Sequence, residues 1–284
     1  MKGKTILITG ANSGIGRAAA KDLASQGAEI IMVTRKSETG IEAKEEIEEA
    51  SNSKKIHQYT CDLASQKQIR LLSEQLHQDF NKIDILLNNA GIIKKKQELT
   101  EDKIEHTFAV NHLSHFLLTQ LNIDLLREAE TARIINVSSM AHEWGKINYK
   151  DINLEEKFSP LKAYSQSKLA NVLFTYELCR RVFKEGITAN AVHPGMVGSR
   201  FGFSRNGSST HWIMKAYQKI ATRPEKGAET LIFLASSPQV DNKSGGYYVH
   251  SKAKTSSKAS YDPDASTALW NMSLRMVGME KSMI

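Results

Sequence analysis

The chain has 284 residues, of which 40% are hydrophobic and 24% are charged, as is typical of a soluble globular protein. Its formal net charge of +7 raises the question of a polyanionic partner. However, Lys and Arg are mostly interleaved with Glu, as in residues 42–49, which is typical of solvated helix faces. With no recognised nucleic-acid motif in the chain, we expect no nucleic-acid partner.

The two cysteines, Cys61 and Cys179, are far apart and fall in different predicted elements. This argues against a disulfide framework or a metal site, and it indicates a reducing compartment. No segment approaches the roughly 18 uncharged apolar residues of a membrane helix. We therefore expect a cytoplasmic protein with no transmembrane segment and no bound metal.

Apolar runs of strand length alternate with amphipathic stretches. The runs predict strands at Thr5–Thr9, Glu29–Val33, Ile56–Cys61, Ile83–Leu87, Arg133–Val137 and Thr188–His193. The amphipathic stretches predict helices at Gly16–Ser25, Glu38–Ala50, Gln66–Gln78, Glu101–Arg127 and Ala163–Lys184, and a further helix starts near Pro224. This alternation predicts a single-domain α/β protein, a Rossmann-type doubly wound parallel sheet with helices on both faces.

We expect one domain over residues 1–284, with a cofactor half at about 1–137. Two long connections, 140–163 and 196–223, follow predicted strands, where open α/β sheets build their binding sites. The second connection is rich in apolar side chains, which predicts a lid over an apolar pocket; the alternative is ordinary packing against the sheet edge. His142 and Trp144 in the first are candidate pocket residues, although a lone histidine there is more often simply exposed.

The first strand runs directly into a glycine-rich turn and a helix. Glycines at this place allow a tight turn and close approach of a pyrophosphate, which then lies at the helix N-terminus. Taken alone the cluster is weak evidence, but its position at the first βα turn strengthens it. The candidate cofactor-binding residues are Gly10, Asn12, Ser13, Gly14, Ile15 and Gly16.

The end of the second predicted strand indicates which nicotinamide cofactor is used. A site for NAD places a carboxylate there, whereas this chain has Thr34 followed by Arg35 and Lys36. A neutral residue followed by cations suits a 2′-phosphate, because a guanidinium can pair with it. The sequence therefore predicts NADP(H) as the cofactor, with Arg17 contributing to its binding. The alternative is that Arg35 is simply a solvent-exposed residue at the end of a strand.

Tyr164 and Lys168 are four residues apart in a predicted helix, so the phenol and the ammonium share a face. Reduction of a carbonyl by hydride needs a proton donor, and oxidation of an alcohol needs a proton acceptor. Tyrosine has an ordinary pKa of about 10, and a nearby ammonium lowers it by favouring the phenolate. Such a pair alone is usually a solvated helix face, so its significance depends on the residues around it.

Further motifs accompany this pair in a fixed order: Thr9–Gly16, Cys61-Asp62-Leu63, Asn88–Gly91, Asn111, Ser138-Ser139 and His193-Pro194-Gly195. With them, the chain resembles the short-chain dehydrogenase/reductase family over nearly its whole length. The resemblance implies that Tyr164 is the general acid and base, that Ser139 orients the substrate oxygen, and that Lys168 holds the nicotinamide ribose. Ser139 is preferred to Ser138 because Met140-Ala141 follows it.

The resemblance also implies that Asn111 anchors a water in a proton relay and that Asp62, with Leu63, contacts the adenine. The remaining implied cofactor-binding residues are Asn89, Ala90, Gly91, Pro194, Gly195 and Val197, together with Tyr164 and Lys168.

Residues 136–142, the insert 149–154 and the tail segments 246–248 and 269–273 resemble the retinol dehydrogenase-like branch of the family. This implies a small apolar alcohol or carbonyl substrate, such as a retinoid, a steroid or an aromatic carbonyl. The alternatives are a reductase of 3-oxoacyl or sugar carbonyls, and a non-enzymatic NADP-sensing protein. The family often pairs through its tyrosine helix and the next one, so we expect a homodimer or homotetramer. Arg180-Arg181 on the tyrosine helix lie at a partner surface or in water.

Overall fold

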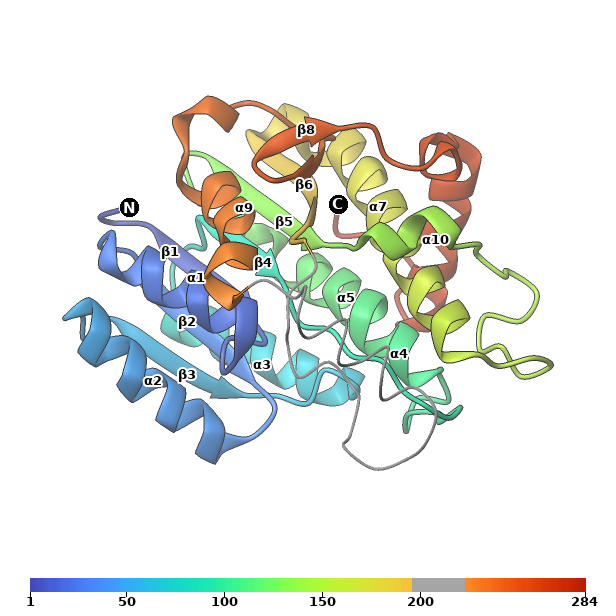
Figure 1. Ribbon diagram of the computed structural model, residues 1–284, viewed down its shortest axis with the longest axis horizontal. Coiled ribbons are helices and arrows are strands. Elements are labelled where there is room, and N and C mark those ends of the chain that lie inside the picture. The colour runs from blue at the N-terminus through green and yellow to red at the C-terminus, as the bar shows by residue number, and fades with distance from the viewer. Residues whose placement is uncertain (196–222) are drawn as a thin grey trace.

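The computed structural model describes residues 1–195 and 223–284. Within them, one sheet has the strand order β3-β2-β1-β4-β5-β6-β7-β8 (Figure 1). Neighbouring strands are parallel from β3 to β7, and β8 pairs antiparallel with β7. The strands are β1 (Thr5–Thr9), β2 (Glu29–Thr34), β3 (Ile56–Thr60), β4 (Ile85–Asn88), β5 (Ala132–Val137), β6 (Ile187–His193), β7 (Tyr247–Val249) and β8 (Lys252–Lys254).

Helices cover both faces of this sheet, which confirms the α/β doubly wound prediction. One face carries α1 (Gly14–Ser25), α2 (Ser37–Ser51) and α9 (Pro224–Ser236), and Figure 1 shows α1 between the other two. The opposite face carries α3 (Gln66–Asp79), α5 (Ser114–Leu121), α7 (Pro160–Val182) and α10 (Pro263–Met276). The connecting helices are α4 (His106–Phe108), η1 (Ala109–Leu113), α6 (Ile123–Arg127), η2 (Met140–Trp144), η3 (Phe183–Glu185), η4 (Pro238–Val240) and η5 (Lys258–Tyr261).

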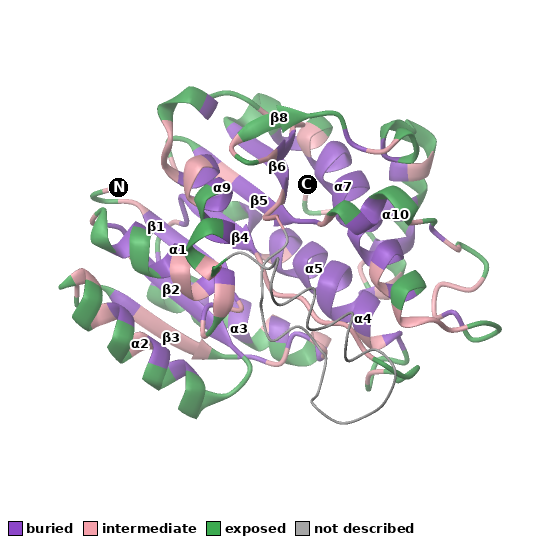
Figure 2. Ribbon diagram, in the orientation of Figure 1, coloured by how far each residue is buried: buried purple, intermediate pink, exposed green. Residues whose placement is uncertain are grey.

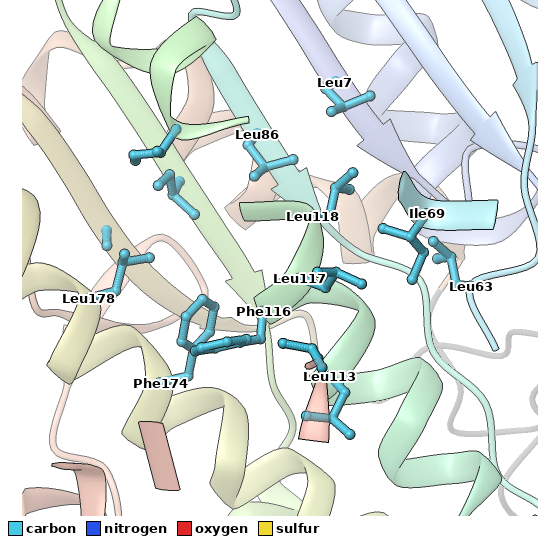
Figure 3. Packing of buried hydrophobic residues seen from close by; sticks show 14 of the residues in the cluster. Leu7, Leu63, Ile69, Leu86, Leu113, Phe116, Leu117, Leu118, Phe174 and Leu178 are labelled. Carbon is cyan, nitrogen blue, oxygen red and sulfur yellow. The ribbon is translucent and has the colours of Figure 1, made fainter. Parts of the chain in front are cut away.

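The alternation of side chains along β1 divides the core into two layers. Ile6 and Ile8 belong to the cluster under α1 and α9, while Leu7 belongs to the cluster under α3, α5 and α7. All three side chains are fully buried, because a parallel sheet covered on both faces leaves no strand face to water. Figure 2 shows buried central strands, an exposed outer side on α2, and α5 as a buried helix. Figure 3 shows Leu7 and Leu86 above Leu117 and Phe116.

The predicted helix Glu101–Arg127 was wrong in its extent. Residues up to 105 are not helical, and Glu105 instead caps α4 by accepting from the backbone N–H groups of Thr107 and Phe108. A π-helical segment, η1, follows, and α5 ends before Asn122, whose backbone leaves the helical region. The side-chain periodicity could not detect these breaks, because residues 104–126 remain largely apolar and buried.

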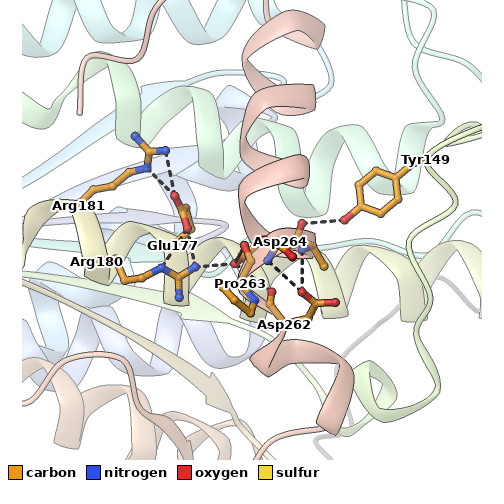
Figure 4. Close-up of polar contacts among 9 residues, drawn as sticks. Tyr149, Glu177, Arg180, Arg181, Asp262, Pro263 and Asp264 are labelled. Carbon is orange, nitrogen blue, oxygen red and sulfur yellow. Dashed lines mark hydrogen bonds and ion pairs between the residues drawn. The ribbon is translucent and has the colours of Figure 1, made fainter.

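The sequence patterns also missed the C-terminal part of the fold. Strands β7 and β8 have three residues each, too short for a recognisable period. The helix predicted from near Pro224 is confirmed as α9, whereas α10 was not predicted. Pro263 begins α10, and Asp262 caps it by accepting from the N–H groups of Asp264 and Ala265 (Figure 4).

Helix α10 packs on α5 and α7 through aromatic side chains. Trp270 is 2% exposed, and its ring centroid lies 5.0 Å from that of Phe116 and 5.8 Å from that of Phe174. The guanidinium of Arg181 stacks on Trp270 at 4.4 Å, and Arg180 donates to Ser266 of α10. Arg180 and Arg181, which also contact Glu177 (Figure 4), therefore join two helices of one chain.

Candidate active site

The candidate site lies at the sheet edge where the parallel strands β1, β2, β4, β5 and β6 end. The turn between β1 and α1 is built from glycines with left-handed backbone, Gly10 (φ 68°) and Gly14 (φ 55°). A Cβ added to Gly16 would lie 2.5 Å from Asn89 Nδ2 and closer still to the Gly10 carbonyl. Helix α1 can therefore approach β1 this closely only because residue 16 is glycine, and its N-terminal N–H groups lie ready for an anion.

The end of β4 is joined to the end of β1 by hydrogen bonds. Thr9 Oγ1 accepts from the backbone N–H groups of Asn89 at 2.9 Å and Ala90 at 3.0 Å. In return, Asn89 Nδ2 donates to the Thr9 carbonyl at 2.8 Å. The structure thus brings together two segments that the sequence assigned to cofactor binding, Gly10–Gly16 and Asn89–Gly91.

The end of β2 presents cations to solvent. Thr34 is buried and accepts from Gln58 Nε2 at 2.9 Å, while Arg35 and Lys36 are exposed. Arg17, also considered for the cofactor, pairs with Glu46 of α2 at 2.6 Å. Exposed cations after a neutral side chain suit an anionic group better than the diol of an unphosphorylated ribose.

Asp62 and Leu63 follow β3 and have different environments. Asp62 Oδ1 accepts from the Ala64 N–H at 2.9 Å, so the carboxylate shapes a turn. Leu63 is buried in the core beneath α3 and α5. The Leu63 side chain is therefore occupied in the core, whereas the half-buried Asp62 lies at the end of β3, where the resemblance implies an adenine contact.

Tyr164 and Lys168 lie on one face of α7. The Lys168 Nζ is 5.6 Å from the centre of the Tyr164 ring and donates to the Val137 carbonyl at the end of β5 at 2.9 Å. Lys168 is only 1% exposed, and this burial lowers the pKa of its ammonium to about 7. Tyr164 is half-buried. A cation this close to a phenol stabilises the phenolate.

The two serines after β5 have separate environments. The Ser138 hydroxyl is buried and donates to the Lys168 carbonyl at 2.8 Å. Ser139 is half-buried; it caps η2, its Oγ accepting from the Ala141 N–H at 3.2 Å. Since η2 packs on α7, Ser139 lies at the surface that also carries Tyr164.

Asn111 lies in η1, the π-helical segment, a feature that is frequent at functional sites. Its Oδ1 accepts from the Ile92 N–H at 2.7 Å, and its Nδ2 donates to the Ile92 carbonyl and to Ser167 Oγ, both at 3.0 Å. Ser167 in turn donates to the Tyr164 carbonyl at 2.8 Å. Asn111 thus connects the segment after β4 to the helix that carries Tyr164.

The segment after β6 begins with Pro194 and Gly195, and Gly195 has a left-handed backbone (φ 86°). Burial lowers the pKa of the adjoining His193 imidazole to about 4, so this side chain is neutral near pH 7. Val197 and the candidate lid, residues 196–222, lie outside the described residues.

The expectation of an exposed histidine after Ser139 was wrong. His142 is fully buried; its Nδ1 is 2.7 Å from the Ser139 carbonyl, and its Nε2 accepts from the Ser257 N–H at 3.0 Å. Burial lowers the pKa of this imidazole. Trp144 is 65% exposed, which leaves it free to meet a ligand.

Sequence reasoning missed two polar residues on the inner face of α7, Ser167 and Asn171. Asn171 Nδ2 donates to the carbonyls of Asn111 at 2.9 Å and Val137 at 3.1 Å. The available signal was helical spacing, because Tyr164, Ser167, Lys168 and Asn171 follow the i, i+3, i+4, i+7 pattern of one face.

The family model for short chain dehydrogenases matches residues 4–207, which is more than half of the chain. The chain belongs to the short-chain dehydrogenase family. Among the relatives of this short-chain dehydrogenase, human retinol dehydrogenases 13 and 14 are each 38% identical to it. The matches cover 98% and 99% of this chain and 86% and 88% of those proteins. It therefore falls in the retinol dehydrogenase-like branch.

Solved structures agree with the fold of this family. A protein from Mycobacterium paratuberculosis described as uncharacterized is 32% identical and superposes with a TM-score of 0.80, covering 98% of this chain and 95% of that one. RhlG from Pseudomonas aeruginosa, solved as an active-site complex with NADP, is 25% identical with a TM-score of 0.69 over 87% of this chain and 94% of its own. The short-chain dehydrogenase is thus an oxidoreductase acting on alcohols and carbonyl compounds.

Membrane spans and metal sites can be judged for residues 1–195 and 223–284. Within these ranges, no helix of the short-chain dehydrogenase has the length and apolar character needed to cross a membrane. The same ranges contain no group of three or more His, Cys, Asp or Glu side chains that could hold a metal ion. Cys61 is buried and Cys179 half-buried, and both are free thiols.

Proposed function

We propose that this short-chain dehydrogenase interconverts an apolar alcohol and its aldehyde or ketone, using NADP(H) and Tyr164 as acid and base. The observation that carries the proposal is the Lys168 ammonium, which is buried 5.6 Å from the centre of the half-buried Tyr164 ring. A cation held in this way stabilises the phenolate, because water does not screen it.

The chain's own residues divide the work of the reaction. Bound NADP(H) supplies or accepts the hydride. Tyr164 gives its phenolic proton to the substrate oxygen during reduction and takes the proton back during oxidation. Ser139 holds that oxygen by a hydrogen bond, Lys168 holds the phenolate and the nicotinamide ribose, and Asn111 supports the relay that returns the proton.

The residues of the cofactor cradle fit a phosphorylated dinucleotide. The Gly10–Gly16 turn leaves room for backbone N–H groups to approach a pyrophosphate, and Arg35 and Lys36 are free to pair with a 2′-phosphate. The described residues at the end of β2 include no carboxylate before Glu38. The NADP complex of RhlG is consistent with this choice of cofactor.

Three observations support an apolar substrate. The relatives with 38% identity are named retinol dehydrogenases. Trp144 and Met140, in the helical turn after Ser139, are exposed apolar side chains. The connection 140–163 adds no buried charge beside Tyr164 that would suit a sugar or a thioester.

The proposed acid and base are tested by Tyr164→Phe. We expect turnover of hydrophobic aldehydes to fall by ~10²–10⁴-fold, because the phenolic proton is lost. The measurement is NADPH oxidation, with NADPH binding followed by fluorescence. Tight binding with near-normal turnover would overturn the role of Tyr164. Tight NADPH binding by the wild type, with no turnover on any carbonyl, would favour an NADP-sensing protein instead.

The cofactor preference is tested by Arg35→Asp. We expect the ratio of kcat/KM for NADPH over NADH to fall by at least about tenfold, because a carboxylate repels the 2′-phosphate. Lys67→Asp is the matched control: Lys67 is an exposed residue of α3, and the change in net charge is the same. An equal change of the ratio in both variants would contradict a specific role for Arg35.

A further inference from the structure

Asn171 lies where three elements of the candidate site meet. It is fully buried on α7, one turn beyond Lys168. Its Nδ2 donates to the carbonyl of Asn111 in η1 at 2.9 Å and to the carbonyl of Val137 in β5 at 3.1 Å. The Val137 carbonyl is the same acceptor that Lys168 Nζ uses at 2.9 Å. One amide therefore supports both the anchor of Lys168 and the backbone of Asn111.

The remaining contacts of Asn171 determine where the hydrogens lie. Both amide hydrogens are used on carbonyls, so Asn171 Oδ1 must be an acceptor. It faces His112 Nδ1 at 3.3 Å, which makes this nitrogen the donor. In a neutral imidazole, Nε2 is then the acceptor, and Ser273 Oγ lies 3.0 Å from it. The hydrogen bonds run in one direction, from Ser273 through His112 and Asn171 to the two carbonyls.

The surroundings of His112 keep its imidazole neutral, with the proton on Nδ1. The imidazole is fully buried, with the rings of Phe108 and Phe174 at centroid distances of 5.1 Å and 5.9 Å. Burial lowers the pKa of His112 to about 4, so the ring is neutral under ordinary conditions. The acceptor Asn171 Oδ1 therefore fixes the tautomer of His112, and Ser273, which belongs to α10 and is fully buried, completes it by donating to Nε2.

We infer that Asn171 is a positioning residue of the proposed reaction, held in its working orientation by His112 and by Ser273 of α10. This inference rests on the proposed function of Tyr164 and Lys168. If the amide turned over, its oxygen would face two carbonyl oxygens, and both contacts would become repulsive. The Asn111 backbone and the anchor carbonyl of Lys168 would then lose a shared support.

The test is Asn171→Asp, which keeps the shape of the side chain but cannot donate to both carbonyls. We expect kcat with NADPH and a hydrophobic aldehyde to fall by about tenfold or more, the rate equivalent of about one hydrogen bond. We expect the dissociation constant of NADPH to change less than about threefold. Asn122→Asp is the control, because Asn122 is equally buried but donates to Leu118 at 2.7 Å, away from the site.

The outcomes separate this inference from the proposed function. If Tyr164→Phe keeps turnover, the proposed function fails and this inference fails with it. If Tyr164→Phe loses turnover while Asn171→Asp keeps the kcat of the Asn122→Asp control, only the role of Asn171 is overturned. Equal losses of kcat in Asn171→Asp and Asn122→Asp would also overturn it, because they would point to general destabilisation.

Ser273→Ala tests the link to α10 and does not depend on the folding of the Asn171 variant. We expect a drop in kcat of about two- to fivefold, because His112 Nε2 is left without its donor and the ring holds Asn171 less firmly. In the double variant with Asn171→Asp, we expect no further loss, because both changes break one connected chain. An unchanged kcat in Ser273→Ala, or additive losses in the double variant, would overturn the role of α10.

Discussion

Lys168 is a lysine almost removed from water, with its Nζ held by the Val137 carbonyl and facing the Tyr164 ring. Burying an ammonium costs free energy unless the group is paired or gives up its proton, which is why its pKa falls to about 7. The charged form of Lys168 is therefore held in its buried place at the expense of fold stability, and near pH 7 the folded chain begins to release its proton. Such strongly perturbed groups are concentrated at functional sites.

The free-energy cost of burying Lys168 predicts how the free energy of unfolding changes with pH. The unfolded chain holds the Lys168 proton up to a pKa of about 10.4, whereas the folded chain releases it above about 7. Between these values the unfolded state binds more protons, so the free energy of unfolding gains from this group as pH rises, by at most about 1.4 kcal/mol per pH unit. The measurement is urea unfolding at pH 6 and pH 9 without cofactor. The advantage of Lys168→Met over the wild type should shrink from pH 6 to pH 9, and a constant difference would contradict a lowered pKa.

The neighbouring serines give a second residue-scale prediction. We expect Ser139→Ala to lose turnover by about 10²-fold, because the substrate oxygen loses a hydrogen-bond donor, with little change in thermal stability. Ser138→Ala should instead lose about 1 kcal/mol of stability, since its hydroxyl bonds the Lys168 carbonyl, and keep most of its turnover. Steady-state kinetics and thermal melts of both variants show which serine binds the substrate. Loss of turnover in Ser138→Ala, with loss of stability in Ser139→Ala, would make Ser138 the substrate-binding serine.

At the scale of elements, the sequence predicted the strands and helices that have a periodic apolar pattern or a known motif. It missed helix breaks and single buried polar contacts, which have no such pattern. The apolar runs located β1 to β6, and the glycine turn and the Tyr164–Lys168 pair located the segments around the site. The helix ending at Arg127 was misjudged because Glu105 and the π-helical segment interrupt it without changing its hydrophobicity. Asn171 was missed because a buried amide has no sequence signature until the carbonyls it bonds are known.

The close approach of α1 to β1 is an element-scale feature that a single methyl group tests. In Gly16→Ala the new Cβ would meet the Gly10 carbonyl and the Asn89 amide, and backbone cannot move aside easily. We expect a loss of about 1–3 kcal/mol of stability together with weaker NADPH binding, measured by urea unfolding and fluorescence titration. Gly186→Ala is the comparison, because Gly186 has left-handed backbone but no atom within 3.5 Å of its added Cβ. A cofactor affinity lowered equally in both variants would rule out local crowding as the cause.

At the scale of the whole molecule, α10 completes the core on the side of α5 and α7. Its position bears on the expected homodimer or homotetramer, because the helix covers part of the α7 surface through which pairing was predicted. That assembly stays a prediction, and the part of α7 covered by α10 is not free for pairing. The residue that ties α10 to the core most extensively is Trp270, which contacts Phe116, Phe174 and Arg181.

Trp270→Ala measures how much the packing of α10 on α5 and α7 contributes to the stability of the fold. We expect a loss of about 3–5 kcal/mol of stability, the usual result of deleting a large buried aromatic side chain. Turnover should fall as well, because the same helix carries Ser273. Differential scanning calorimetry with and without NADPH provides the measurement. A variant that melts at the wild-type temperature would show that α10 is only loosely attached.

The late place of α10 along the chain has a consequence for how the protein is made. Pro263, where α10 starts, lies 142 residues further along the chain than Leu121, where α5 ends. At about 5–20 residues per second of synthesis, the ribosome reaches α10 roughly 7 to 28 s after it has completed α5. During that interval Phe116, joined later by Phe174, lacks the ring of Trp270 that covers it in the folded protein. The growing chain is therefore most open to chaperones, and to mispairing with neighbouring chains, just before its last long helix emerges.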